Sequence, residues 1–169
     1  MTSTADRTAA SLGGKYLTFF LAGEEYGVEI LRVQEIISMM PVTRVPRTPP
    51  YIRGVINLRG KVIPIMDLRE KFGMPPATEP EQVMIVVQVA GVQIGVVADK
   101  VSEVASIASE DIDPTPDFGA EFHTEFLLGL GKSNGRLRLL LDIERVLSTE
   151  EVTALTSLPA HDQGVNAHA

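Results

Sequence analysis

Two parts of this chain repeat two others in the same order. Residues 21–36, LAGEEYGVEILRVQEI, align without a gap on residues 89–104, and six of the sixteen positions are identical at an offset of 68. Residues 52–72 align on residues 127–147 at an offset of 75, and both glycines and the aspartate of the first segment recur. Coincidence hardly produces such matches in the same order, so we expect a tandem of two related structural units.

The local pattern within each half is that of short β-strands. Residues 15–22 and 83–89 are rich in β-forming residues, and each is followed by a turn signal and a second short strand. A further hairpin is expected in each half, around Gly60 and around residues 133–135, where glycine supplies the positive φ of the turn. Short strands with turns at this spacing predict an all-β fold with a small barrel in each half.

The repeat and the tails set the expected domain boundaries. We place the first barrel at about residues 15–82 and the second at about 83–147, and we leave strand exchange between them open. Residues 1–14 and 159–169 are small and polar, so they are expected to be mobile tails.

Helices are expected at three places. Asp67 and its counterpart Asp142 each follow an apolar strand and are typical N-caps of short helices. Ser148 and Glu151 form a capping-box pattern at the start of a C-terminal helix at about residues 148–158.

The composition excludes several kinds of active site. The chain has no cysteine, which rules out disulfide bonds, thiolate metal sites and cysteine nucleophiles. No nucleotide-binding, metalloprotease or serine-hydrolase motif occurs, and His123, His161 and His168 lack the spacing of metal ligands. We therefore expect no enzymatic activity, no metal and no cofactor.

The ends and the apolar runs of the chain carry no membrane signal. The N-terminal segment lacks the basic start and apolar run of a signal peptide. No apolar run approaches the roughly 18 residues that a spanning helix needs, so direct membrane insertion is not expected.

Charge is unevenly distributed along the chain. The formal net charge is −7, which argues against non-specific binding of nucleic acid. Residues 44–71 nevertheless hold seven basic and two acidic residues, and this segment either steers an acidic partner or is simply a solvated face. An SH3-like nucleic-acid-binding module remains the alternative function, although it needs stacking aromatic residues and only Tyr51 lies near the centre of this segment.

The hairpin at residues 52–68 has features that a simple barrel does not need. Pro64 cannot donate a backbone hydrogen bond, so its strand is expected at a sheet edge or in a bulge. Arg59 lies at the apex of the hairpin, and Glu35 lies in the apolar run RVQEI. Two interpretations stay open: the two residues form an ion pair, or Glu35 points outward while Arg59 lies in solvent.

These segments resemble the CheW family of chemotaxis coupling proteins over about residues 15–155. The resemblance is carried by EEYGVEILRVQEI, by NLRG with the following P-x-x-DLR, by VVADKVSEV and by TEFLLGLGKSNGRLRLLLDIERVL, in that order. It implies two intertwined five-stranded SH3-like β-barrels related by pseudo-symmetry. It also implies a non-catalytic adaptor between the signalling tips of chemoreceptors and the regulatory domain of the histidine kinase CheA.

The resemblance further implies a cytoplasmic protein that is associated with membrane receptor arrays through its partners. The chain leaves no room for a kinase or receiver segment, so the free-standing coupler is the best match within the family.

The resemblance also assigns roles to individual residues. It implies receptor contact through Val33, Glu35, Arg59 and Gly60, and a groove between the barrels lined by Val96, Val101 and Val104. It implies kinase contact through Gly54, Val55 and Ile56. In the second half KSNG replaces NLRG and Leu139 replaces Pro64, so we expect the two hairpins not to be interchangeable docking sites.

Overall fold

The computed structural model describes residues 12–77, 81–114, 126–133 and 135–146 of the chain. Most of these residues lie in two β-sheets, so the prediction of a mostly β fold is confirmed. Sheet A contains β1 (Gly14–Leu21), β2 (Glu24–Glu29), β8 (Lys100–Ile107), β9 (Ile112–Asp113), β10 (Leu127–Ser133) and β11 (Arg136–Leu141). Sheet B contains β3 (Val33–Ser38), β4 (Ile52–Leu58), β5 (Lys61–Asp67), β6 (Val83–Val89) and β7 (Val92–Ala98). The described helices are short: η2 (Ile30–Arg32), α2 (Leu68–Lys71), η3 (Ser109–Asp111) and α3 (Ile143–Val146).

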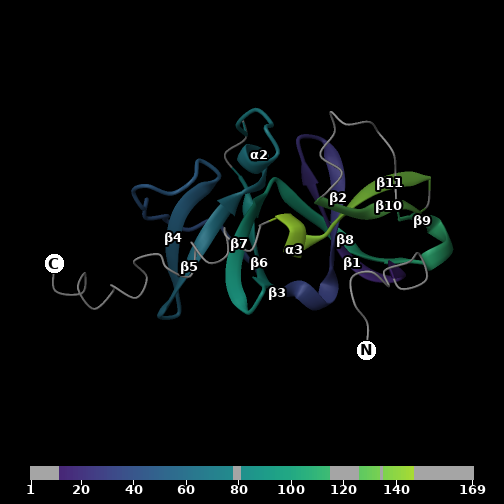
Figure 1. The fold of residues 1–169 in the computed structure, drawn as a ribbon, viewed down its shortest axis with the longest axis horizontal. Helices are drawn as coiled ribbons and strands as arrows, with labels where there is room; N and C mark the ends of the chain where they lie inside the picture. The colour runs from purple at the N-terminus through teal and green to yellow at the C-terminus, as the bar shows by residue number, and fades with distance from the viewer. Residues whose placement is uncertain (1–11, 78–80, 115–125, 134, 147–169) are drawn as a thin grey trace.

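The two sheets exchange their hairpins. Sheet A has the strand order β8-β1-β2-β11-β10-β9, and sheet B has the order β3-β6-β7-β5-β4. Figure 1 shows this as a mixing of colours, with purple β1 and β2 beside green β10 and β11, and teal β6 and β7 beside blue β4 and β5. The sheets therefore cut across the predicted division at residues 82 and 83, and the strand exchange that the sequence left open is present.

The repeat is visible in the details of the strand pairing. Ladder β3·β6 shifts its register at Gln34, and ladder β1·β8 shifts at Ser102, 68 residues later. Ladder β4·β5 shifts at Arg53, and ladder β10·β11 shifts at Leu128, 75 residues later. Each sheet also has one parallel junction, β2·β11 in sheet A and β5·β7 in sheet B. Two related sequences thus form two sheets with the same plan.

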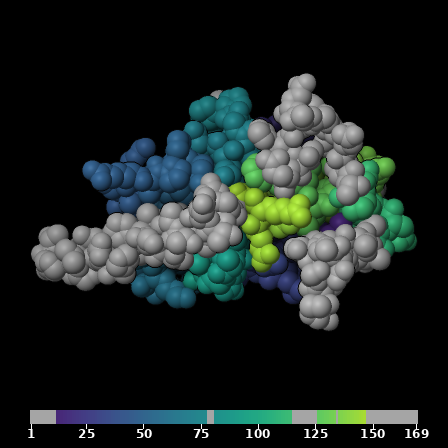
Figure 2. Space-filling model, viewed as in Figure 1, coloured from purple at the N-terminus to yellow at the C-terminus, as the bar shows by residue number. Residues whose placement is uncertain are grey.

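Three apolar clusters hold the sheets together. The largest draws on both sheets and includes Phe19, Tyr26 and Leu141 from sheet A and Met66, Ile94 and Val96 from sheet B. A second cluster lies within sheet A, around Tyr16, Ile107 and Leu140, and a third lies within sheet B, around Ile56, Ile63 and Val86. Burial of apolar area contributes about 25 cal/mol per Å², so the shared cluster is what fixes the two sheets to one another. In Figure 2, helix α3 lies at the surface between blue-teal sheet B and green sheet A.

The predicted caps are confirmed. Asp67 Oδ1 accepts a hydrogen bond of 3.0 Å from the backbone N–H of Arg69 at the start of α2. Asp142 Oδ1 accepts one of 3.1 Å from the backbone N–H of Glu144 in α3. Gly73 has a φ of 73°, as expected of the residue that ends a helix. The predicted C-terminal helix, most of residues 1–14, residues 159–169 and His123 lie outside the described residues.

The sequence predicted that the strand of Pro64 lies at a sheet edge or in a bulge. The edge alternative is wrong, whereas the β4·β5 ladder does shift its register, at Arg53 of β4. Strand β5 lies between β7 and β4, and β4 is the edge strand. Val55, opposite Pro64, directs both its N–H and its C=O to Thr43 on the far side, at 2.8 Å each. The parallel ladder to β7 begins one residue later, at Ile65 and Gly95. Pro64 therefore occupies a position where no donor is required on either side.

The chain crosses between the described sheets at two places, and an ion pair braces each. After β7 it crosses at Asp99, whose carboxylate accepts from Arg69 Nη2 at 2.7 Å and Nε at 3.1 Å and from the Ala22 N–H at 2.9 Å. After β2 it crosses through η2, where Arg32 Nη1 lies 2.6 Å from Glu144 Oε2. The first pair is largely buried, whereas the second is more exposed.

We expect Gly54→Ala to destabilise the fold strongly. Gly54 has a φ of 143°, and a Cβ there would lie 2.1 Å from the backbone oxygen of Thr43, so the backbone must move. Gly91→Ala is the matched control, because Gly91 has a φ of 80° with nothing within 4 Å. Urea unfolding is expected to show a loss at Gly54 that exceeds the loss at Gly91 by about 2 kcal/mol or more. Equal losses would show that the Thr43 contact does not constrain β4.

We expect the two crossover ion pairs to differ in strength. Asp99→Asn removes a carboxylate that accepts three hydrogen bonds, and it should lower the free energy of unfolding by about 1–3 kcal/mol. Glu144→Gln breaks the more exposed pair and should cost less than about 1 kcal/mol. Denaturant unfolding of both variants checks this order, and the reverse order would contradict it.

Candidate docking surface

An ion pair joins the apex of the β4–β5 hairpin to the edge strand β3. Arg59 Nη2 donates a hydrogen bond to Glu35 Oε1, with side chains that are 68% and 30% exposed respectively. The first of the two open interpretations is therefore the observed one. Both partners remain accessible, so a charged partner can contact them without opening the core.

The local backbone explains why the pair forms. Arg59 and Gly60 have φ values of 52° and 86°, which is the geometry of a two-residue hairpin turn with both central residues left-handed. Asn57 Oδ1 accepts from the Gly60 N–H at 2.9 Å and closes the turn. The turn thus presents Arg59 toward β3 in a fixed direction.

A row of amide side chains continues from this pair across sheet B. Gln34 Nε2 donates to Gln88 Oε1 at 3.0 Å, and Gln93 Nε2 donates to Gln34 Oε1. Lys61 Nζ donates to Gln93 Oε1 at 3.1 Å, so the row runs over β3, β6, β7 and β5. The sequence interpretation missed this row, although its glutamines alternate with apolar residues along the strands.

The other predicted receptor-contact residues differ in exposure. Gly60 is exposed at the hairpin apex, and Val104 on β8 is 51% exposed. Val33 and Val101 are half-buried and pack against the shared cluster. Val96 is only 2% exposed, so its side chain belongs to the core and offers no surface in this structure. Glu35, Arg59 and Gly60 lie together in sheet B, whereas Val101 and Val104 belong to sheet A.

The predicted kinase-contact residues lie on the edge strand β4. Val55 is half-buried and its backbone bonds Thr43, while Gly54 is buried against the same residue. Ile56 is 2% exposed and belongs to the cluster inside sheet B. Of these three residues, Val55 is the one whose side chain reaches the surface.

Exposed apolar side chains were also missed by the sequence interpretation. Leu31 in η2 is 95% exposed, and Ile36 on β3 and Leu137 on β11 are 44% and 53% exposed. Ile36 corresponds to Val104 at the repeat offset of 68, so the same apolar position is exposed in both sheets. The repeat in the sequence already showed that Ile36 and Val104 are equivalent, and this was the signal that could have drawn attention to both.

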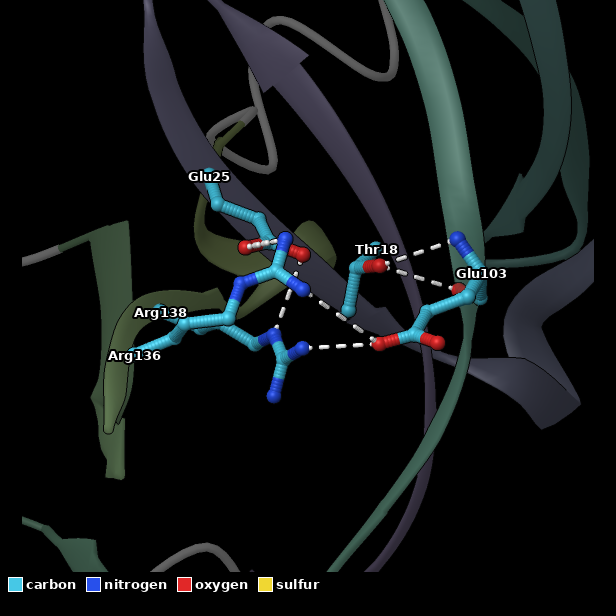
Figure 3. Close-up of polar contacts among 5 residues, drawn as sticks. All are labelled: Thr18, Glu25, Glu103, Arg136 and Arg138. Carbon is cyan, nitrogen blue, oxygen red and sulfur yellow. Dashed lines mark hydrogen bonds and ion pairs between the residues drawn. The ribbon is translucent and has the colours of Figure 1, made fainter. Parts of the chain in front are cut away.

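In sheet A the counterpart of the Glu35–Arg59 pair is an ion network that centres on a buried arginine (Figure 3). Arg138 on β11 is fully buried, and its Nε lies 3.0 Å from Glu25 Oε2 on β2. Its Nη2 lies 2.8 Å from Oε2 of Glu103, which is the counterpart of Glu35. Arg136 Nη2 also reaches Glu25 Oε1 at 2.7 Å, and Thr18 Oγ1 bonds the backbone of Glu103. The two halves thus use related carboxylates differently: Glu35 pairs with an exposed arginine, whereas Glu103, itself 48% exposed, pairs with a buried one.

The network changes the acidity of its buried carboxylate. Burial acts to raise the pKa of Glu25, but the hydrogen bond and positive charge of Arg138, aided by Thr18 and Arg136, hold that pKa below its ordinary value of 4.5. At the crossover, burial opposes the hydrogen bonds and charge of Arg69, yet the pKa of Asp99 also lies below its ordinary value of 3.8.

The described part of the chain contains neither a candidate metal site nor a spanning helix. Within it, no group of three or more histidine, cysteine, aspartate or glutamate side chains could hold a metal ion. None of its helices is long and apolar enough to cross a membrane.

Comparison with known proteins gives consistent matches over most of the chain. The family model of the CheW-like domain matches residues 15–151. The chain is 42% identical over 149 residues to the chemotaxis protein CheW of Klebsiella aerogenes, covering 88% of this chain and 90% of that protein. It is 39% identical over 142 residues to the chemotaxis protein CheW of Rhizobium meliloti, covering 82% and 91%. The solved structure of the scaffolding protein TtCheW from Thermoanaerobacter tengcongensis matches with a TM-score of 0.75 and 31% identity, covering 83% of this chain and 96% of that chain.

We expect the protein to lose stability in acid as the buried carboxylate of Glu25 is protonated. Because the folded pKa of Glu25 lies below the unfolded value, the unfolded chain binds more protons as the pH falls below about 4.5. The contribution of Glu25 is therefore complete above that pH and is lost as the pH falls through the lower folded pKa. Urea unfolding between pH 7 and pH 3 should show this decline, and Glu25→Gln should make it shallower. An unchanged decline in the variant would assign the acid sensitivity to other carboxylates.

Proposed function

We propose that this chain, which belongs to the family of CheW-like domains, is a chemotaxis scaffold that couples chemoreceptor signalling tips to the histidine kinase CheA. The observation that carries the proposal is the match to chemotaxis CheW proteins and to a solved CheW scaffold over more than four fifths of the chain. Coupling requires two accessible faces on one rigid body, and it requires no reactive centre.

The fold supports a finer proposal about the two sheets. Each sheet repeats the same strand order and encloses its own apolar cluster. We infer that each closes into a SH3-like barrel, with β9 as an additional strand on sheet A. A single domain at residues 15–158 would then consist of two intertwined barrels and a C-terminal helix, with tails before and after it.

The receptor face in this proposal centres on Glu35 and Arg59. Their accessible ion pair, Gly60 beside it and the half-buried Val33 form one face of sheet B. Val101 and Val104 extend the face onto sheet A, while Val96 supports it from the core. Charges of this kind fix the register of a partner and suppress wrong partners more than they add affinity.

The kinase face in this proposal lies along the edge strand β4. Val55 provides accessible side-chain surface, and the buried Gly54 and Ile56 hold the strand in place. An edge strand is suited to this role because it carries backbone groups that a neighbouring strand can use, here partly covered by Thr43. This face adjoins the proposed receptor face, since β4 leads directly into the hairpin apex at Arg59.

We further propose that the protein catalyses nothing and uses no cofactor. It acts in the cytoplasm and reaches membrane receptor arrays through its partners. The alternative of an SH3-like nucleic-acid-binding module gains no support, since the matched relatives are chemotaxis proteins. The net charge of −7 argues against it as well.

Reconstitution tests the proposal directly. Kinase activity is measured with receptor signalling fragments on vesicles, with and without this protein, and co-sedimentation reports binding to each partner separately. We expect receptor-dependent kinase activity only when the protein is present. Absence of binding to both partners at low and moderate salt would reject the proposed function.

We expect charge reversal at the candidate receptor face to weaken coupling while the fold is kept. Glu35→Lys and Arg59→Glu each place like charges together at an accessible position, and each should weaken receptor binding by about tenfold. Co-sedimentation and kinase activation measure the loss, and the midpoint of urea unfolding should stay close to that of the parent.

Glu110→Lys is the control, because Glu110 is exposed in η3, between β8 and β9 of sheet A, and belongs to neither proposed face. It changes the net charge by the same amount as Glu35→Lys and should leave coupling intact. If Glu35→Lys and Arg59→Glu also couple normally, the proposed receptor face is in the wrong place.

A further inference from the structure

Two arginines in the loop between β3 and β4 stand apart from all others that the structure describes. Arg44 and Arg47 are exposed, and neither makes a hydrogen bond or an ion pair within the described residues. Every other described arginine forms an ion pair with a carboxylate, namely Arg32, Arg53, Arg59, Arg69, Arg136, Arg138 and Arg145. The guanidinium group is always charged in proteins, so this loop carries two positive charges without a counter-charge.

The same loop borders a hollow with positive charge on its wall. The hollow has a volume of about 360 Å³, and Arg44 and Arg53 line it together with apolar, proline and threonine residues of the segment 45–52. None of these lining residues is acidic. The side chain of Arg53 is 37% exposed, and its Nε lies 3.3 Å from Oδ2 of Asp67. The hollow thus offers positive charge beside apolar surface.

The backbone of the loop is held in place before any partner arrives. Thr43, just before the first arginine, exchanges two backbone hydrogen bonds of 2.8 Å with Val55 of β4. Thr48 Oγ1 donates a hydrogen bond of 2.9 Å to the Val45 carbonyl. Residues 46–50 include three prolines, each of which fixes its φ angle. A partner that binds here therefore has little loop ordering to offset.

Arg47 occupies a turn position that glycine would fill with less strain. Its φ is 65°, in the left-handed region that residues other than glycine, asparagine and aspartate rarely adopt. Pro46 precedes it in the turn, as in a type II turn, where proline is followed by a residue with a positive φ. Such strain persists mainly where it serves a function. The other described arginine with a positive φ is Arg59, which forms the accessible pair of the proposed receptor face.

We propose that this loop is a binding site for an acidic segment of a partner protein, whose carboxylates pair with Arg44, Arg47 and Arg53. A guanidinium can donate two parallel hydrogen bonds to one carboxylate, so arginine suits this recognition better than lysine does. The apolar part of the lining, which includes Val45 and Ile52, receives the apolar side chains that flank the acidic residues of such a segment.

The position of the hollow indicates which partner it serves. Arg53 lies near the start of β4, and Thr43 pairs with Val55 of the same strand. The proposed kinase face lies along β4, so this inference rests on the proposed function and assigns the acidic segment to the kinase. Arg59 of the proposed receptor face follows the other end of β4, so a change in the loop should affect the two partners differently.

Nucleic acid fits the same observations less well. Binding of single strands relies on aromatic side chains that stack with bases, and the aromatic residue of this segment, Tyr51, already has Lys71 Nζ at 4.3 Å from its ring centroid. The net charge of −7 also repels a long polyanion. A short acidic segment is affected less, because charges beyond about 8 Å are screened at physiological salt.

Titration with the purified regulatory domain of the kinase tests the inference, and co-sedimentation with receptor fragments gives a separate readout. Arg44→Glu should weaken kinase binding by about tenfold at physiological salt and should leave receptor binding unchanged. Arg44→Lys keeps the positive charge and should weaken kinase binding by less than about threefold. Kinase binding by the parent should also weaken as salt is raised, and Arg44→Glu should reduce this dependence. Equal losses for the two variants would overturn the inference.

Arg47→Gly separates recognition from stability. Glycine adopts a φ of 65° without strain, so this variant should keep or raise the midpoint of urea unfolding. The same variant lacks one of the three charges and should weaken kinase binding by about threefold or more. A residue with only a structural role would not lose kinase binding while the fold is kept. Unchanged kinase binding by Arg47→Gly would show that the strained arginine does not serve recognition, and would overturn its part in the site.

Lys15→Glu is the matched control, because Lys15 is exposed on β1 and belongs to neither proposed face, and the change alters the net charge as Arg44→Glu does. It should bind the kinase as the parent does, and an equal loss would overturn the inference. A parent protein that fails to bind the kinase would reject the proposed function and this inference with it. A parent that binds, with Arg44→Glu and Arg47→Gly binding equally well, would overturn the inference alone. Displacement of the kinase by a short DNA duplex at micromolar concentration would assign the hollow to nucleic acid instead.

Discussion

Each sheet takes its central hairpin from the half of the sequence that does not supply its neighbouring strands, and the shared core depends on that exchange. Phe19 and Tyr26 reach the apolar cluster between the sheets from one side, and Ile94 and Val96 reach it from the other. The chain between these elements is short, since η2 and Asp99 alone separate strands of different sheets. The two sheets are consequently held by the covalent path of the chain as well as by their packing.

The duplicated halves have diverged in where they place charge. Glu35 and Glu103 occupy equivalent positions, yet Glu35 pairs with an accessible arginine at a hairpin apex and Glu103 joins a buried one. In one half the arginine that meets this carboxylate is exposed, whereas in the other it lies in the interior. A scaffold built from two copies of one unit thereby presents different faces to different partners.

Much of the fold could be predicted from the sequence because its signals are local. The hairpins, the turn at Gly60 and the caps at Asp67 and Asp142 follow from turn and capping chemistry within a few residues. The exchange of hairpins is a long-range feature that follows from the short connections after β2 and β7, so local patterns left it open. Pro64 misled the prediction because the missing N–H leaves no hydrogen bond unmade. Val55, which lies opposite Pro64, directs its own N–H and C=O to Thr43.

The candidate site was predicted in part for a similar reason. The ion pair of Glu35 and Arg59 could be inferred from charges placed beside apolar runs, and the structure brings the two residues together. The depth of Val96 and Ile56 could not be inferred, because a valine or isoleucine in a strand looks the same whether its face is covered or open. The buried Arg138 was missed because an arginine in an alternating strand usually points to solvent.

The interleaving of the strands also constrains how such a protein can evolve. Cutting the connector between α2 and β6 would leave two fragments, neither of which holds all the strands of either sheet. Neither copy of the ancestral unit can be lost, moved to another gene or replaced by a foreign domain while the other survives. Gene duplication usually allows one copy to change independently of the other. Here each sheet needs strands from both copies, so the two copies must be retained together.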